Sequence, residues 1–341
     1  MDSLSQIALG AAVGVAVMGR RTAVWKAAAW GALAGTLPDL DVLIDQGDPI
    51  RNMVLHRAET HAPFWLTLFA LPFGAAVAWL SGQRTLWRRW VLAMWAVLVT
   101  HPLLDGMTVY GTQLGLPFTN HPYGVGSIFI IDPLYTLPLL VGTIWALRSG
   151  AAGRGLAANA AGLVLSTAYL GWGVWAQQHV TGVARAALAT QGIVADRLLV
   201  TPAPLNTLLW RVVAVQGSSY HEGFRSLLDS GPAMAFDRFD RNTALWPAVQ
   251  GLDGAQRIAA FSHGFWALDV RDSGQGSRLH ITDLRMGQEP AFVFRFALAQ
   301  RQGDAWLPLP LVQQVGMRPD VGRAWAWLWR RALGQPVPPP R

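Results

Sequence analysis

The 341-residue chain contains no cysteine and only one lysine, Lys26, and charged residues make up only 14% of it. Without cysteine the chain can form no disulfide framework, no thiolate metal site and no cysteine nucleophile, so any bound metal must be held by His, Asp or Glu. The net charge is +7, but the arginines are scattered singly and form no basic stripe. We therefore expect no nucleic-acid partner.

Apolar residues and tryptophan are abundant, at 52% of the chain and 17 residues respectively. The polar residues are unevenly distributed, because residues 1–179 hold 10 of the 27 basic and 8 of the 20 acidic side chains. Such a composition suits lipid better than water. We predict a helical membrane domain over residues 1–179, an extramembrane domain over 180–334, and a Pro-rich tail over 335–341 that is disordered or polyproline.

Six apolar runs in the first domain are candidates for membrane-spanning helices, which need about 20 apolar residues or somewhat fewer if their ends snorkel. They cover residues 4–18, 27–37, 64–80, 90–104, 128–147 and 156–176. The second run is short and the fourth ends in His101-Pro102, so either can be a half-span. We expect an all-α polytopic domain of five to six helices.

Arginine and lysine in short loops favour the cytoplasmic side of a bacterial inner membrane. Three loops carry them, at residues 20–26, 84–89 and 148–154, and these loops alternate onto one side. Segments 36–62 and 101–127, together with everything after residue 176, then face the periplasm. Arg51 and Arg57 lie on the wrong side for this rule.

The second half of the chain has the residue composition and pattern of a soluble domain. Strand-like runs occur at residues 208–215, 263–270, 278–284 and 291–299. Residues 272–276, Asp-Ser-Gly-Gln-Gly, are a good hairpin turn between two of them. We predict a small α+β domain with an antiparallel sheet.

Ionisable residues cluster at the boundaries of the apolar runs in the first domain. Asp39 and Asp41 are two residues apart, a spacing that puts both on the same side of an extended stretch. The second pair, His56 and His61, is five residues apart, so one histidine should precede a helix and the other lie in its first turn. A third pair, separated by four residues, shares one helix face; it consists of His101 and Asp105.

These three imidazoles and three carboxylates form a nitrogen and oxygen ligand set that suits zinc, manganese or iron, as one or two ions. A single histidine at a helix end, or an aspartate pair alone, is explained as well by capping. Capping does not explain six such groups on one membrane face, because ionisable groups beside lipid are energetically costly. We predict a divalent metal site, with zinc favoured, whose ligands are Asp39, Asp41, His56, His61, His101 and Asp105.

The same motifs resemble, in their order, the YdjM-like family of membrane-bound metal-dependent hydrolases. They are Met1-Asp-Ser-Leu-Ser-Gln-Ile-Ala-Leu-Gly, Gly35-Thr-Leu-Pro-Asp-Leu-Asp, His56-Arg-x-x-Thr-His, His101-Pro-Leu-Leu-Asp, Thr108-Val-Tyr-Gly-Thr-Gln and Ile130-Ile-Asp-Pro-Leu-Tyr-Thr. The resemblance covers about residues 1–147, and segments 201–228 and 282–287 resemble the C-terminal extension of the family's longer members. The sequence departs from the family pattern at Ala62, where serine is usual, and at Glu59, where an uncharged residue is usual.

The resemblance implies hydrolysis by a metal-activated water at the inner membrane. The His-x-x-x-Asp element is similar to one in zinc phospholipase C and P1-type nucleases, which suggests a phosphodiester or a phospholipid headgroup as substrate, with membrane lipid as the partner. In this hypothesis Asp41 or Asp105 takes a proton from water. Arg57 either contacts a phosphate oxygen or anchors the chain at headgroup level.

Four further residues on the same side are candidates for supporting the ligands: Thr108, Tyr110, His121 and Asp132. Asp132 precedes Pro133 and is equally suited to capping the fifth span. Two rival functions remain open. One is a non-enzymatic metal-binding membrane protein or transporter, although the crowding of ionisable groups at one boundary favours hydrolysis over a relay. The other is a scaffold whose soluble domain does the work. The sequence does not fix the oligomeric state.

Overall fold

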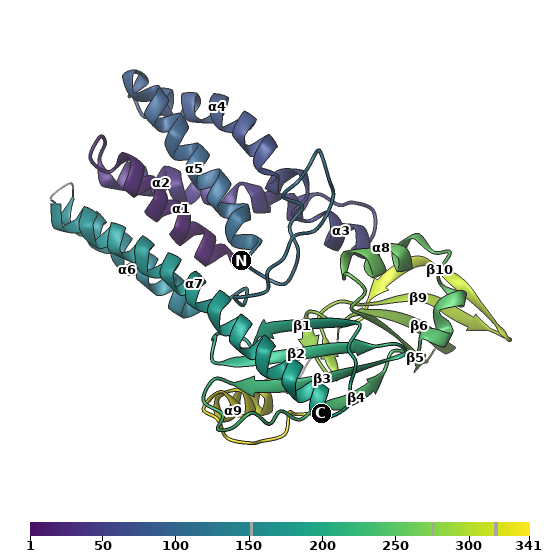
Figure 1. Ribbon diagram of the computed structural model, residues 1–341. Helices are drawn as coiled ribbons and strands as arrows, with labels where there is room; N and C mark the ends of the chain where they lie inside the picture. Colours follow the sequence, from purple (N-terminus) through teal and green to yellow (C-terminus); the bar gives the residue numbers. More distant parts are fainter. Residues whose placement is uncertain (151–152, 275, 317–319) are drawn as a thin grey trace. The chain divides into compact units, whose positions relative to one another are not determined.

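The computed structural model describes residues 1–150, 153–274, 276–316 and 320–341. Contacts divide the chain into two compact units, a helical one and one rich in β-strands (Figure 1). Unit 1 comprises Met1–Ile44, His56–Trp175 and Pro204–Asn206. Unit 2 comprises Asp45–Leu55, Ala176–Ala203 and Thr207–Arg341.

Unit 1 is built from α-helices joined by short 3-10 turns. The helices are α1 (Ser3–Met18), α2 (Val24–Thr36), α4 (Pro63–Leu80), α5 (Trp87–Asp105), α6 (Pro133–Ser149) and the first part of α7 (Gly153–Thr190), and the turns are η1 (Pro38–Leu43), η2 (Glu59–His61) and η3 (Arg84–Leu86). Each of the six apolar runs therefore contains a helix, as predicted. Two bounds were wrong, because α6 begins at Pro133 rather than at residue 128 and α7 continues to Thr190 rather than ending at residue 176.

Among the described residues, one helix is both long and apolar enough to cross a membrane by itself, and it is α4. A shorter apolar helix, α1, falls below that length. That the other helices of unit 1 also span a membrane remains a prediction.

Helices α1 and α2 are in close backbone contact at glycines. A Cβ atom added at Gly31 would lie 2.2 Å from the carbonyl oxygen of Gly10, and one added at Gly10 would lie 2.3 Å from the carbonyl oxygen of Gly31. Gly35, one turn further along α2, approaches the carbonyl oxygen of Gln6 in the same way. This crossing fixes the start of α1 against the end of α2, and α1 also packs against α5 and α6.

Unit 2 contains two four-stranded antiparallel sheets and a two-stranded one. Their strand orders are β1-β2-β3-β4, β10-β9-β6-β5 and β7-β8. The strands are β1 (Arg197–Pro202), β2 (Leu209–Gln216), β3 (Ser219–Ser226), β4 (Asp237–Asp240), β5 (Trp266–Ser273), β6 (Gly276–Asp283), β7 (Gly287–Gln288), β8 (Ala291–Phe292), β9 (Arg295–Gln302) and β10 (Ala305–Gln314). The unit's helices are the second part of α7, from Ala176, and α3 (Pro49–Leu55), α8 (Asp253–Phe261) and α9 (Val321–Ala332), with a 3-10 turn η4 (Thr243–Ala248).

The first three strand-like runs of the sequence coincide with β2, β5 and β6, and the fourth covers β8 and the start of β9. These strand predictions are confirmed. Strands β5 and β6 pair antiparallel, with Ser273 opposite Gly276. Residue 275 of the predicted hairpin turn lies outside the described residues. Pattern reasoning missed β1, β3, β4, β7 and β10.

Strand β10 occupies one edge of its sheet and contains two prolines, Pro308 and Pro310. Its pairing with β9 shifts register between Pro308 and Gln313. Proline has no backbone N–H, which confines it to edge strands and bulges. The sequence of β10 is therefore compatible with an edge position alone.

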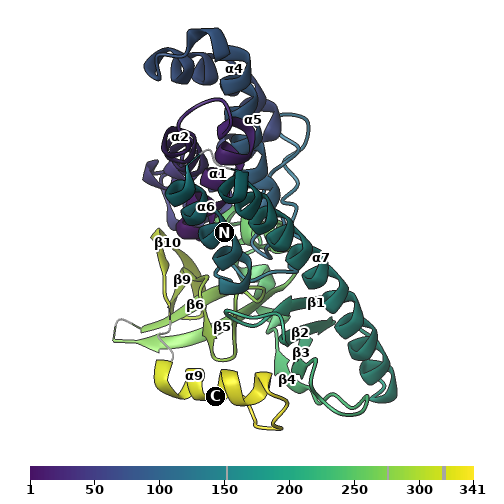
Figure 2. The ribbon, with the colours of Figure 1, turned by 90° about the vertical axis from the view of Figure 1, so that its left-hand side faces the viewer.

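Helix α9 and the tail that follows it pack beside the β1–β4 sheet (Figures 1 and 2). Trp327 and Leu328 are buried against Leu209 of β2 and Phe224 of β3. The tail is irregular but held, because the Arg341 guanidinium donates to Asp237 at 2.6 Å.

An ion pair fastens α9 to the loop after β3. Arg331 contacts the two carboxylate oxygens of Asp229 at 2.5 and 2.6 Å. Burial raises the pKa of Asp229, but hydrogen bonds from Arg331 and from the Ser226 N–H lower it by more, so the pKa lies below its ordinary value. The folded state thus favours the carboxylate. Its stabilisation is complete above the unfolded pKa of about 4 and disappears as pH falls through the lower folded pKa.

We expect Asp229→Asn to weaken the docking of α9 by about 2 kcal/mol at neutral pH, because it breaks a charge-assisted contact. Amide hydrogen exchange of α9 in the full chain measures this, after correction for intrinsic rates. In the wild type, the same protection should begin to fall below about pH 4 and should be lost as pH passes through the lower folded pKa. Asp304→Asn, at an exposed carboxylate, serves as the control, and equal protection in both variants would contradict the assignment.

Candidate metal centre

Four predicted ligands meet at the start of one element of unit 1 and the ends of two others. Asp39 lies in η1, His61 closes η2, and His101 and Asp105 lie in the last turns of α5. The spacing of four does place His101 and Asp105 on one face of α5, with 3.4 Å between Nε2 and Oδ2. One ligand atom from each residue lies within 4.8 Å of every other.

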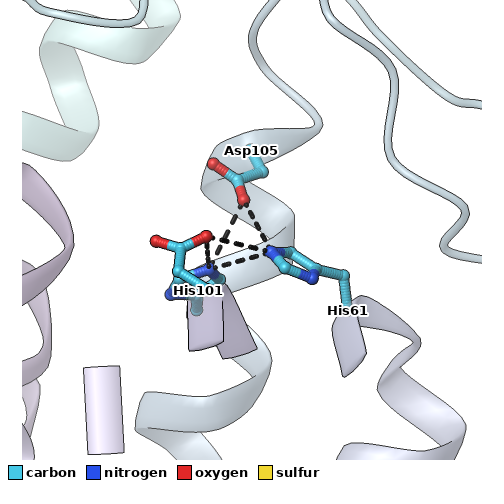
Figure 3. A group of neighbouring side chains, drawn as sticks. His61, His101 and Asp105 are labelled. Carbon is cyan, nitrogen blue, oxygen red and sulfur yellow. Dashed lines mark hydrogen bonds and ion pairs between the residues drawn. The ribbon is translucent and has the colours of Figure 1, made fainter. Parts of the chain in front are cut away.

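Five of the six distances between the donor atoms of this cluster are nearly equal, and the sixth, between the two carboxylates, is within 4.8 Å. The Nε2 atoms of His61 and His101 are 3.2 Å apart. Asp105 Oδ2 lies 3.3 Å from the first and 3.4 Å from the second. Asp39 Oδ1 likewise lies 3.3 Å from His61 Nε2 and 3.4 Å from His101 Nε2. Figure 3 shows the side chains of His61, His101 and Asp105 converging on a common point.

The five equal spacings match those of a four-coordinate metal site. Nitrogen and oxygen ligands lie about 2.0–2.1 Å from tetrahedral zinc, so neighbouring donors in a regular tetrahedron are about 3.3–3.4 Å apart. His61, His101 and Asp105 are buried, and Asp105 Oδ2 has no hydrogen-bond partner among the described residues. A buried carboxylate oxygen without a donor is costly unless a cation occupies the space beside it.

Hydrogen bonds at the far side of each imidazole orient the rings. His101 Nδ1 lies 2.8 Å from the carbonyl oxygen of Gly35, so Nδ1 carries the proton and Nε2 presents a lone pair to the cluster. The Thr60 hydroxyl donates to Asp41 at 2.8 Å, so its oxygen accepts from His61 Nδ1 at 2.9 Å. Both histidines are thereby held in the tautomer that a metal requires.

The other two predicted ligands, Asp41 and His56, pair with each other. His56 Nδ1 lies 2.7 Å from Asp41 Oδ1, and the second oxygen of Asp41 accepts from the Arg57 N–H at 3.0 Å. The expectation for Asp39 and Asp41 assumed extended backbone, whereas η1 is a 3-10 turn in which residues two apart diverge. The two carboxylates contact different nitrogens of His61, Nε2 at 3.3 Å and Nδ1 at 3.6 Å. His61 lies in η2, before α4 rather than in its first turn.

The polar surroundings keep both aspartates of η1 ionised. Burial raises the pKa of Asp39, but contacts with His101 and His61 lower it by more, and the pKa lies well below its ordinary value. For Asp41 the contribution of burial is likewise outweighed, first by the hydrogen bond from His56, and the pKa is lowered. A carboxylate at each position suits cation binding or proton acceptance.

Arg57 lies inside the site, with only 5% of its surface exposed. Its Nη2 is 3.4 Å from Asp105 Oδ1, its Nη1 donates to Thr108 at 3.2 Å, and its guanidinium covers the ring of Tyr110 at 4.8 Å. The backbone of Arg57 adopts a positive φ of 66°, which is unusual for a non-glycine residue. The predicted supporting residues Thr108 and Tyr110 thus hold Arg57.

The remaining supporting candidates have different neighbours. Asp132 caps α6 by accepting from the Leu134 N–H at 3.0 Å, and the Tyr169 hydroxyl donates to it at 3.0 Å. This bears out the capping alternative. His121 lies edge-on to the ring of Tyr123, with ring centroids 4.7 Å apart.

Sequence reasoning missed two residues at the centre, Gln6 and Thr60. Gln6 is buried in α1, and its Nε2 donates to Asp105 Oδ1 at 3.1 Å and to the His101 carbonyl at 3.2 Å. The α-amino group of Met1 also contacts Asp105. A signal was present, since a glutamine in an apolar helix is costly unless it is bonded. Thr60 was marked only by its place next to a ligand histidine.

Comparison with known proteins bears on the helical part of the chain. The family model described as YdjM inner membrane protein matches residues 1–180, which include every residue of the cluster. The β-rich remainder lies beyond this match. No match to a curated protein or to a solved structure was found. Because the match covers more than half of the 341 residues, the chain belongs to the YdjM inner membrane protein family.

Proposed function

We propose that the chain is a zinc-dependent hydrolase of the inner membrane, with Asp39, His61, His101 and Asp105 as the zinc ligands. The observation that carries this proposal is the set of five donor-to-donor distances between 3.2 and 3.4 Å. Two imidazoles and two carboxylates in four-coordinate spacing suit zinc better than manganese or iron, which favour higher coordination numbers.

The proposal includes a polytopic membrane domain in unit 1, with the cluster on the periplasmic side. Helices other than α4 also present large apolar side chains outward, which supports contact with lipid. On α6 these side chains are Leu137, Val141, Ile144 and Trp145. The arginine distribution of the loops supports the sidedness.

With a coordination position left open for water, a bound zinc ion would lower the pKa of that water and polarise the scissile group. The chain's own residues would supply the remaining functions. His56 is suited to accept the proton, because Asp41 holds its Nδ1 at 2.7 Å and its side chain is 24% exposed. Asp41 itself is fully engaged by His56, Thr60 and the Arg57 N–H. Asp105, the other predicted acceptor, would serve as a ligand.

A lipid-type phosphodiester is the substrate class that the surroundings favour. Between and beyond the two aspartates of η1, the side chains of Leu40, Val42 and Leu43 are exposed. An apolar surface on the ligand-bearing turn suits a substrate with acyl chains. Arg57, beside Asp105, balances negative charge at the site and is the side chain suited to meet a phosphate oxygen.

Replacing His56 with glutamine should leave the metal content unchanged and lower kcat by a factor of about 10² to 10⁴, the usual contribution of a general base. The measurement combines metal analysis of the purified protein with hydrolysis of a panel of phosphodiesters and phospholipids in bilayer nanodiscs. The exposed His179 on α7 provides a matched control, His179→Gln.

Loss of metal in the His56 variant would instead make His56 a ligand, as the sequence predicts. Stoichiometric metal without turnover of any ester in the panel would reject the hydrolase and favour a non-enzymatic metal-binding protein.

A further inference from the structure

Helix α9 exposes a ridge of apolar side chains beside its buried face. The ridge consists of Val321, Trp325, Trp329 and Leu333, which recur every four residues and therefore align along the helix. Trp329 is partly exposed, and the other three are 73%, 52% and 62% exposed in that order. Trp327, Leu328 and Ala332 fill the core of unit 2, and Trp329 packs against it from the edge. The exposed members Val321, Trp325 and Leu333 are therefore not part of that core.

Basic side chains flank this ridge. Arg323 and Arg330 are exposed, and Arg330 is held by the Gln335 side chain at 2.9 Å. The acidic residue next to them, Asp320, is the N-cap of α9 and accepts from the Arg323 N–H. Exposed Leu228 extends the apolar surface, since the backbone of Gly334, just after α9, packs against the carbonyl of Leu228.

The buried side of α9 holds the ridge in a fixed orientation. Arg331, on that side, is bound to Asp229, and the Ser226 hydroxyl donates to the carbonyl oxygen of Ala332 at 2.6 Å. Trp325 and Trp329 lie edge to face, with ring centroids 5.6 Å apart. The ridge is therefore formed before any partner is present and pays no folding cost on binding.

We propose that α9 is an interfacial helix whose ridge inserts into the headgroup region of an anionic lipid bilayer. Tryptophan is enriched at membrane interfaces because its ring is both apolar and polar, and arginine beside it is attracted to anionic lipid. The chain's membership in a family of inner membrane proteins places such a surface within reach of the whole molecule. This inference concerns unit 2 and does not depend on the metal or on the reaction.

The absence of cysteine makes the test direct, because one introduced cysteine is the only labelling site. A nitroxide at Ala326→Cys, beside the ridge on the exposed side of α9, is compared with one at Asp304→Cys in the turn before β10. The full chain is reconstituted in vesicles of phosphatidylethanolamine with phosphatidylglycerol, or of phosphatidylcholine alone. Collision rates with oxygen and with a water-soluble nickel chelate report depth in the bilayer.

We expect the Ala326 label in anionic vesicles to be accessible to oxygen and shielded from nickel, while the Asp304 label stays accessible to nickel. Adding Arg323→Gln and Arg330→Gln should lower the ratio of docked to free helix about 25-fold, at about fivefold per arginine. Trp325→Glu should abolish shielding, with hydrogen exchange of the buried face of α9 unchanged as the check on folding.

Two outcomes would overturn the proposal. Nickel accessibility at position 326 equal to that at position 304 in anionic vesicles means that the ridge stays in water. Shielding from both reagents, unchanged in detergent, means that protein covers the ridge.

Discussion

Purified protein carrying His101→Ala should retain no stoichiometric metal and, under the proposed function, should hydrolyse no phosphodiester. His101 contacts all three other members of the cluster, and its Nδ1 is fixed by the Gly35 carbonyl. Removing residues that merely orient a ligand costs about 10- to 100-fold in metal affinity, so loss of a ligand should cost more than about 100-fold. Elemental analysis of the detergent-purified protein, after dialysis against a chelator, measures the effect.

Two further variants separate ligand loss from misfolding. Asp105→Asn keeps the size of the side chain while removing its charge, and it should also lose zinc. His179→Ala removes an exposed histidine from α7 and should keep it. Full zinc occupancy in His101→Ala would reject the ligand set, whatever the activity.

Gly31→Val should destabilise unit 1 and release the metal, although residue 31 is not part of the cluster. A Cβ at Gly31 would lie 2.2 Å from the Gly10 carbonyl oxygen, which is backbone and cannot rotate away. The helices must separate, at a cost of about 3 kcal/mol for this overpacking. Their ends carry the Gly35 carbonyl and Gln6, which hold His101 and Asp105, so the cluster should loosen with them.

The comparison for this variant is Gly171→Val in α7, where an added Cβ meets no atom within 4 Å. Both changes carry the same helix-propensity cost, so the difference in the free energy of unfolding isolates the crossing of α1 and α2. Thermal unfolding in detergent and metal content are measured together. Equal stability of the two variants would show that the helices do not need this close approach.

The helices of unit 1 were predictable because the six apolar runs contain a single acidic or basic residue, Asp132, although the second run is short. The cluster was harder to assemble from sequence. Asp39 and Asp41 were assigned to one side on the assumption of extended backbone, whereas Pro38 opens a 3-10 turn. Proline at the first helical position is a recognised start signal, and reading it would have separated the two carboxylates.

Polar contacts between strands explain why much of unit 2 escaped prediction. Strand β3 is buried at every position, yet its sequence, Ser-Tyr-His-Glu-Gly-Phe-Arg-Ser, shows no apolar alternation. Glu222 is buried because Arg211 on β2 lies 2.7 Å away, and Arg225 is buried because carbonyl oxygens of the following loop accept from it. Such pairing depends on tertiary neighbours that no local pattern contains.

The prolines of β10 also affect whether two molecules of the protein can pair through their sheet edges. An edge strand with exposed apolar side chains, here Leu307 and Leu311, is a template on which a second chain can add a strand and begin aggregation. Pro308 and Pro310 remove two backbone donors from this template, and the register shift that follows interrupts it further. The edge therefore resists intermolecular strand addition, which matters for a protein that is concentrated in the plane of a membrane.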